Sequence, residues 1–195
     1  MRKDEHSFKR KLILSFCIMT ALIICSGIIG WVITAEIEKT NMVIDSIHLL
    51  KEAELQLRRE EKNFLIRGYS TTSFNQWQKA KEDFHHILGK LEGMNALTPA
   101  EIIRFDSTNS ELANIYKDFF EDIRSGKLTE DQMTKYDKEF KEYGSMSLQL
   151  INNILDRNQA ILSKLELRSN VLIILFTIAF VGIASSLVIS VLRNL

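Results

Sequence analysis

Residues 12–35, LILSFCIMTALIICSGIIGWVITA, and residues 169–192, SNVLIILFTIAFVGIASSLVISVL, contain no charged side chain. Each run has 24 residues, and as a helix it would measure about 36 Å, more than the roughly 30 Å of hydrocarbon in a bilayer. Two buried core helices of this kind would need a large protein around them, and the chain has only 195 residues. The first run exceeds the apolar region of a signal peptide, and no A-x-A-like cleavage site follows it. The sequence therefore predicts two membrane-spanning helices.

The charges that flank these runs predict the orientation of the chain. Residues 1–11 carry five basic and two acidic side chains, whereas residues 36–168 carry 19 basic and 23 acidic ones. Positively charged flanks stay in the cytoplasm. We therefore expect a protein of the cell membrane with a cytoplasmic tail at residues 1–11, an extracytoplasmic segment at residues 36–168 and the start of a cytoplasmic connector at residues 193–195.

Composition argues against several classes of function. The 25 basic residues balance the 25 acidic ones, so no overall positive charge favours binding to nucleic acid. Both cysteines, Cys17 and Cys25, lie in the first apolar run, which leaves the outer segment without a disulfide or a zinc–thiolate site. The sequence contains no P-loop, G-x-S-x-G, H-E-x-x-H or C-x-x-C motif, so we expect no enzyme, no cofactor and no bound metal.

The outer segment is predicted to be helical almost throughout. Three stretches fit the S/T-x-x-E/Q capping box that begins a helix, at residues 73–76, 98–101 and 129–132. The second stretch also places the only proline at the first helical position. A plausible helix stop precedes each box, at residues 68–72, 93–95 and 125–127. The predicted helices are therefore about 35–68, 74–93, 98–124 and 129–168.

Apolar side chains recur every three or four residues along the last three of these helices. Such spacing, together with short connections, predicts an all-α domain, namely an antiparallel up-down-up-down four-helix bundle flanked by two transmembrane helices. The residues in these stripes are Phe74, Trp77, Phe84, Leu88 and Leu91, then Ile102, Phe105, Leu112, Tyr116, Phe119 and Ile123, and finally Tyr136, Phe140, Tyr143, Ile151, Ile154, Ile161 and Leu165.

The lengths of the helices and the small residues in the spans favour a homodimer embedded in lipid. The two central helices are shorter than the outer two, which leaves a two-helix stalk that buries little apolar surface alone. Small residues recur every four positions in both spans and allow close helix approach in lipid. They are Ser26, Gly30 and Thr34 in the first span, and Gly182, Ser186 and Ser190 in the second.

A charged stretch at the distal end of the first outer helix is the candidate site. Glu54 and Glu61 occupy positions that should face inward with Leu57, and a buried charge is costly unless it is paired. One interpretation is an internal ion-pair network with Arg58 or Lys81. The other is a polar pocket for a small anionic ligand, in which basic side chains donate to a carboxylate or phosphate. The candidate ligand-binding residues are Arg58, Arg59, Glu61, Lys62, Arg67 and Lys81.

The same stretch carries a resemblance to known sensor domains. Residues 57–84, LRREEKNFLIRGYSTTSFNQWQKAKEDF, resemble the four-helix-bundle sensor domains of prokaryotic histidine kinases and chemotaxis receptors. The similarity is to the CHASE-type all-helical class and to the helical bimodular class, whose first helices carry a similar R-x-x-E-K-x-F-L-x-R-G run, here Arg58 to Gly68. The outer segment is too short for two stacked bundles, so a single bundle is implied.

This resemblance implies a receptor module. Such a module would bind a small ligand, with a carboxylate as one candidate, outside the membrane. It would then transmit a shift of helix 129–168 relative to helix 35–68 through the second span to a cytoplasmic kinase or chemotaxis module. The chain ends three residues after the second run, so the output module is expected to be absent from these residues. The alternative is a membrane-anchored helical scaffold or interaction protein without signalling output.

Overall fold

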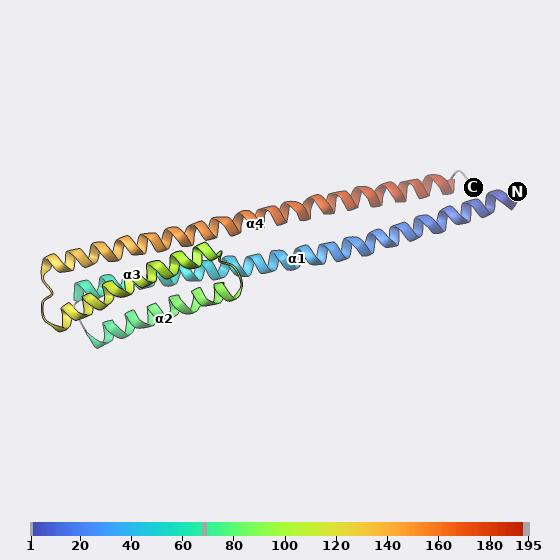
Figure 1. Cartoon of the computed structure of the whole chain (residues 1–195). Coiled ribbons are helices and arrows are strands. Elements are labelled where there is room, and N and C mark those ends of the chain that lie inside the picture. The colour runs from blue at the N-terminus through green and yellow to red at the C-terminus, as the bar shows by residue number, and fades with distance from the viewer. Residues whose placement is uncertain (1, 68–69, 193–195) are drawn as a thin grey trace. The chain divides into compact units, whose positions relative to one another are not determined.

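The computed structural model describes the backbone of residues 2–67 and 70–192, and their side chains except those of residues 2–8, 11 and 67. Within these residues the chain forms four helices and no strand, which confirms the all-α prediction (Figure 1). The helices are α1 (Arg2–Arg67), α2 (Thr71–Gly93), α3 (Pro99–Arg124) and α4 (Glu130–Leu192). The chain divides into a terminal unit, Met1–Thr40 with Ile161–Leu195, and a core unit, Asn41–Ala160.

Both long helices are candidate membrane spans. The parts Leu12–Ile66 of α1 and Glu130–Leu192 of α4 are long and apolar enough to cross a bilayer, and each contains an apolar stretch of 18 residues of which none is buried. These two helices make up most of the chain and also supply two of the four helices of the core unit. Helices α1 and α4 thus have residues in both units, whereas α2 and α3 lie wholly within the core unit.

Two of the three predicted capping boxes are present. The Thr98 backbone N–H donates to Glu101 Oε2 at 2.7 Å, and the Glu101 N–H donates to Thr98 Oγ1 at 3.3 Å. The Thr129 N–H donates to Gln132 Oε1 at 2.9 Å, and the Gln132 N–H donates to Thr129 Oγ1 at 3.3 Å. These reciprocal bonds satisfy backbone N–H groups that the first turns of α3 and α4 leave without a partner.

The predicted box at residues 73–76 is wrong. Helix α2 begins at Thr71, and its N-cap is Ser70, whose Oγ accepts the Ser73 N–H at 3.1 Å. Ser73 itself is buried and its hydroxyl lies 2.8 Å from that of Ser70. A serine three residues after the N-cap cannot return a bond to the cap as Glu or Gln does, so the sequence pattern for this start is weak.

The second and third helices end in the same way. The Ala96 N–H donates to Leu91 O at 3.0 Å, and the Lys127 N–H donates to Asp122 O at 3.1 Å. Each bond closes a turn in which one residue adopts a left-handed conformation, Asn95 at φ 53° and Gly126 at φ 65°. Glycine and asparagine are the residues that tolerate this conformation best, which explains why the chain leaves both helices at these positions.

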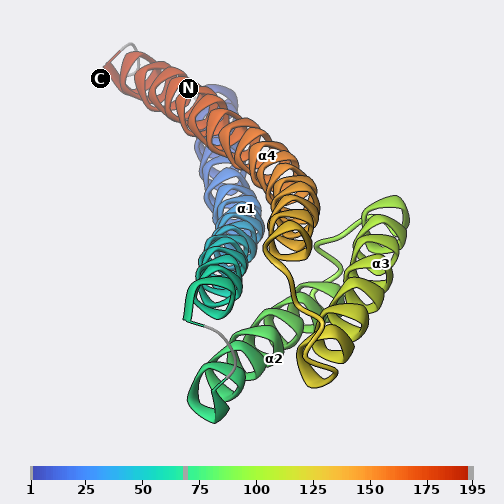
Figure 2. The same ribbon diagram turned by 90° about the vertical axis from the view of Figure 1, so that its left-hand side faces the viewer.

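All four helices contribute to the hydrophobic core of the core unit. Figure 2 views this unit from the end that carries the α3–α4 turn and shows α4 between α1 and α3. Burial of each large apolar side chain contributes about 2 kcal/mol. The core includes Leu57 and Phe64 of α1, Trp77 and Ala80 of α2, Leu112, Tyr116 and Phe119 of α3, and Tyr136 and Phe140 of α4.

The predicted apolar stripes largely face this core, with one exception. Trp77, Phe105 and Ile151 are among the buried members, whereas Ile161 is 43% exposed. Ile161 is the first residue of α4 that belongs to the terminal unit. Leu165, the next member of the stripe, is again buried, so the exposure is confined to one position.

Side-chain hydrogen bonds join α3 to α4 at three levels. The Tyr136 hydroxyl donates to Asp122 Oδ2 at 2.7 Å, and the Tyr143 hydroxyl donates to Glu111 Oε2. The Arg157 Nη1 donates to both carboxylate oxygens of Glu101 at 2.7 Å, and its Nη2 donates to the Ala96 carbonyl at 2.6 Å. Rising residue numbers on α4 meet falling numbers on α3, so these two helices run antiparallel.

Candidate functional site

Three acidic side chains of α1 are buried in the core unit, Glu54, Glu60 and Glu61. Glu60 accepts hydrogen bonds from Gln56 and Asn63 of its own helix, whereas the other two belong to one cluster that joins several helices. Glu54 is 1% exposed and Glu61 is 3% exposed, as their inward positions on the stripe of α1 predict. With Arg58 and Tyr116 they form a cluster that we name the charged layer. The full burial of two carboxylates is unusual, because acidic residues are rarely buried unless they are paired.

Arg58 pairs with both carboxylates. Its Nε donates to Glu54 Oε1 at 2.9 Å, and its Nη1 donates to Glu61 Oε2 at 2.5 Å and to the Phe140 carbonyl at 3.2 Å. The Tyr116 hydroxyl donates to the other oxygen of Glu61. The layer thus joins α1 to α3 through Tyr116 and to α4 through Phe140. Of the predicted ion-pair partners, Arg58 fills this role.

Burial changes the acidity of both carboxyl groups. It raises the pKa of Glu61 to about 8, against the opposing effect of Arg58 and with a further increase from the charge of Glu54. Burial likewise raises the pKa of Glu54, while Arg58 and a hydrogen bond from Ser147 lower it. In water both carboxyl groups would be ionised at neutral pH. In the charged layer both depend on the single guanidinium of Arg58 to stabilise a negative charge.

A glycine on α4 makes room for Arg58. A Cβ atom at Gly144 would lie 2.8 Å from Arg58 Nε and closer still to Arg58 Cδ. Both distances are shorter than the van der Waals contact distance between non-bonded carbon and nitrogen atoms. Gly144 is the only glycine of α4 within the core unit. Its lack of a side chain lets the Arg58 side chain cross the surface of α4 and reach Phe140 O.

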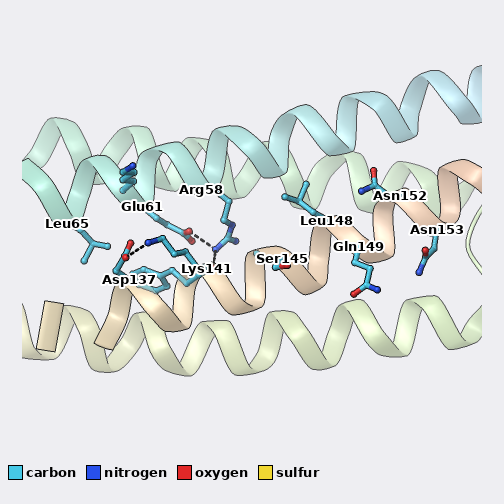
Figure 3. A pocket seen from close by; sticks show the side chains of 13 residues that line it. Arg58, Glu61, Leu65, Asp137, Lys141, Ser145, Leu148, Gln149, Asn152 and Asn153 are labelled. Atoms are coloured by element: carbon cyan, nitrogen blue, oxygen red, sulfur yellow. Dashed lines mark hydrogen bonds and ion pairs between the residues drawn. The ribbon is translucent and has the colours of Figure 1, made fainter. Parts of the chain in front are cut away.

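An open groove of about 580 Å³ lies beside the charged layer, between α1 and α4 (Figure 3). Arg58 and Glu61 project from α1 into it, and the dashed line between Asp137 and Lys141 in Figure 3 marks an ion pair of 2.5 Å. Lys62 and Lys141 are both exposed. The α1 side of the groove is lined by Arg58, Glu61, Lys62 and Leu65, and the α4 side by Asp137, Phe140, Lys141, Gly144, Ser145, Leu148, Gln149, Asn152 and Asn153.

The structure brings three of the six predicted ligand-binding residues together. Arg58, Glu61 and Lys62 line the groove. Arg59 is part of the same helix but is directed to Gln56, whose Oε1 accepts its Nη1 at 3.0 Å, and it does not line the groove. The side chain of Arg67 lies outside the described residues, as do Gly68 and Tyr69.

Lys81 lies elsewhere in the core unit. Its Nζ stands over the rings of Trp77 and Tyr116, at 5.4 and 5.6 Å from their centroids. It lines a small cavity of about 20 Å³ together with Glu54 and Arg58, yet within the part of the chain described it makes no ion pair with a carboxylate. The alternative in which Lys81 neutralises Glu54 or Glu61 by direct pairing is therefore wrong.

Sequence reasoning missed the α4 side of the groove. No charged residue occurs from Gly144 to Leu155, although about a quarter of the whole chain is charged. Exposed side chains of this stretch, among them Ser145, Gln149 and Asn153, are small or uncharged. A charge-free stretch on a helix that also carries exposed positions is the signal that could have marked this surface.

Among the described residues, no group of three or more His, Cys, Asp or Glu side chains could hold a metal ion. The groove presents ammonium and amide groups that can bind a polar or charged group, and the charged layer holds two carboxyl groups that can bind a proton. Comparison with family models, with curated proteins and with solved structures finds no match for this chain.

Proposed function

We propose that the chain is the signal-sensing part of a prokaryotic membrane receptor. In this proposal α1 and α4 cross the cell membrane, both termini lie in the cytoplasm, and the core unit is an up-down-up-down helical bundle outside the membrane. A small anionic ligand binds the groove between α1 and α4 of a homodimeric receptor. The shift that follows passes along α4 to a cytoplasmic signalling module.

The observation that carries this proposal is the continuity of the two helices that line the groove. Helix α1 is unbroken from Arg2 to Arg67, and α4 is unbroken from Glu130 to Leu192. Each therefore carries one wall of the groove and one candidate span. A ligand that binds one arrangement of α1 and α4 better than another shifts the population toward it, and a continuous helix can transmit the displacement.

The contacts of α4 indicate where such a displacement would occur. Side-chain hydrogen bonds that link α1 to α4 and lie at the groove are Arg58 Nη1 to Phe140 O at 3.2 Å and Lys51 Nζ to Asn152 Oδ1 at 2.9 Å. Both residues on the α4 side also line the groove. A ligand bound there would lie directly on the contact between the two helices.

The polar lining favours a small anion. Lys62 presents an ammonium group at the edge of the groove, Lys141 presents a second one that is paired with Asp137, and Asn152 and Gln149 present amides. Arg58 is already engaged by two carboxylates and a carbonyl, so it acts as part of the wall and not as a free donor. Hydrogen bonds to charged groups contribute about 1.5–3 kcal/mol each, so one such bond, made in only one arrangement of the helices, would match the 1–3 kcal/mol typical of coupling between sites.

A chimeric receptor tests the ligand site. The chain is joined at Leu195 to the linker and kinase-controlling module of a chemotaxis receptor and exposed to a panel of amino acids and small carboxylates. We expect a dose-dependent response, and Lys62→Ala and Lys141→Ala should raise the half-maximal concentration about tenfold each, the equivalent of one lost contact of about 1.4 kcal/mol. Lys79→Ala, an exposed lysine on α2 outside the groove, is the matched control.

The outcome of this experiment separates the two classes of function. A scaffold without signalling output would respond to no compound in the panel. A response that both lysine variants retain in full would place the ligand site outside the groove.

Cysteine labelling in intact cells tests the membrane topology. In a background without Cys17 and Cys25, Lys127→Cys in the exposed α3–α4 turn should react with a membrane-impermeant maleimide added outside. Ser7→Cys in the N-terminal tail should react only after the cells are broken. The reverse pattern would contradict the orientation that the basic tail predicts.

A further inference from the structure

We propose that the charged layer is a proton-binding site: Glu54 and Glu61 share one proton in the folded core unit, and its release in alkaline solution loosens α1 from α3 and α4. This inference is independent of any ligand in the groove and adds a response to pH.

The geometry places two carboxylates against one guanidinium. Glu54 and Glu61 are 1% and 3% exposed, and Arg58 lies between them with a hydrogen bond to each. If both carboxyl groups were ionised, the interior would hold one uncompensated negative charge. An unpaired buried charge costs several kcal/mol, and binding of a proton removes it.

The other titratable groups around the layer leave this excess in place. On α2, Lys81 faces the rings of Trp77 and Tyr116, and burial followed by the Lys81 charge lowers the pKa of His85, so the imidazole adds no positive charge near neutral pH. The groups that share a cavity or groove with the two carboxylates are Arg58 and Lys62 on α1, Lys81 and His85 on α2, Tyr116 on α3, and Asp137, Lys141 and Tyr143 on α4.

The hydrogen bonds of Glu61 suit a protonated carboxyl group as well as a carboxylate. Arg58 donates to one oxygen and Tyr116 shares a hydrogen bond with the other. When Glu61 carries the proton, its hydroxyl can donate to Tyr116 Oη while Arg58 still donates to the second oxygen. Glutamine can make the same two bonds, since its amide N–H replaces the acid O–H and its carbonyl still faces Arg58.

The stability of the core unit should therefore depend on pH in a defined direction. The folded state holds a proton that an unfolded carboxyl group releases near its ordinary pKa of 4.5, and it keeps that proton until the pH passes about 8. Within that window the folded state binds more protons than the unfolded state, so stability falls as pH rises and levels off above the window.

Two measurements on the full chain in detergent test this inference. Infrared difference spectra between pH 6 and pH 10 should show the C=O stretch of a protonated carboxylic acid that disappears at the alkaline end. The melting temperature of the core unit, followed by the fluorescence of Trp77 in a Trp31→Phe background, should fall from pH 6 to about pH 8 and level off above it. Glu61→Gln and Glu54→Gln each leave one carboxylate for one guanidinium. Either variant should therefore lack the infrared band, and its melting temperature should no longer fall with pH over this range. Glu52→Gln, an exposed acid on α1, should preserve both.

The stoichiometry supplies a further check. The double variant Glu54→Gln/Glu61→Gln leaves Arg58 without a carboxylate, and it should melt at a lower temperature than either single variant at every pH. If wild type shows no acid C=O band at pH 6, or if the band survives in both single variants, the inference is wrong. The infrared measurement on wild type decides the matter even if a variant fails to fold.

Discussion

Replacement of Arg58 by methionine is expected to lower the free energy of unfolding of the core unit by about 3–5 kcal/mol, the loss typical when one partner of a buried ion pair is removed. Methionine fills a similar volume but offers no donor. Glu54 and Glu61, which are almost fully buried, would lose their shared partner, and the bond to Phe140 O would also disappear. Urea unfolding in detergent, followed by Trp77 fluorescence in a Trp31→Phe background, measures the change.

Arg59→Met is the matched control for this variant. Arg59 is exposed and its one hydrogen bond in the structure is to Gln56 on the same helix, so its replacement should change stability by less than about 0.5 kcal/mol. If the loss at Arg58 is due to stranded carboxylates, Glu54→Gln with Glu61→Gln should reduce it, because amides do not need the guanidinium. An equal loss in both backgrounds would assign the effect to packing alone.

Gly144→Ala is expected to destabilise the core unit although alanine is the better helix former. Alanine in place of glycine normally stabilises a helix by about 1 kcal/mol. Here the new Cβ would meet Arg58 Cδ and Nε, which are held by bonds to Glu54, Glu61 and Phe140. Displacement of Arg58 would cost most of the about 3–5 kcal/mol expected when its ion pairs are removed. We therefore expect the free energy of unfolding to fall by about 2–4 kcal/mol in the same experiment.

Gly89→Ala is the matched control, and it is expected to stabilise the core unit. Gly89 lies within α2, and a Cβ there would meet nothing within 4 Å, so the substitution should stabilise by up to about 1 kcal/mol. In an Arg58→Met background, where the flexible methionine can move aside, Gly144→Ala should become far less harmful. Additive losses at positions 58 and 144 would contradict the contact that we describe.

The sequence contained most of the secondary structure but less of the site. Thr98 and Thr129 cap the starts of α3 and α4 through hydrogen bonds to residues three positions away. Because these bonds join residues close in the sequence, they can be predicted from it. The inward positions of Glu54 and Glu61 follow from helical periodicity in the same way.

The partners of these residues could not be predicted, because they depend on the rotation and register of helices distant in the chain. Tyr116 lies 55 positions from Glu61, and Phe140 lies 82 positions from Arg58. Lys81 is one of the two predicted ion-pair partners, but the rings of Trp77 and Tyr116 lie beneath its ammonium group in place of a carboxylate. Gly144 is an isolated glycine in the sequence, but the steric reason for it, the close approach of Arg58, is evident only from the structure.

The side-chain hydrogen bonds between α3 and α4 fix the relative register of these two helices. Two of these pairs are Asp122 with Tyr136 and Glu101 with Arg157, and their spacing is 122 − 101 = 21 residues on α3 and 157 − 136 = 21 residues on α4. A slip of one helical turn between α3 and α4 would break all three levels at once, whereas α1 and α4 share fewer side-chain hydrogen bonds. If the helices shift as we propose, we therefore expect α3 and α4 to move together and α1 to move relative to both.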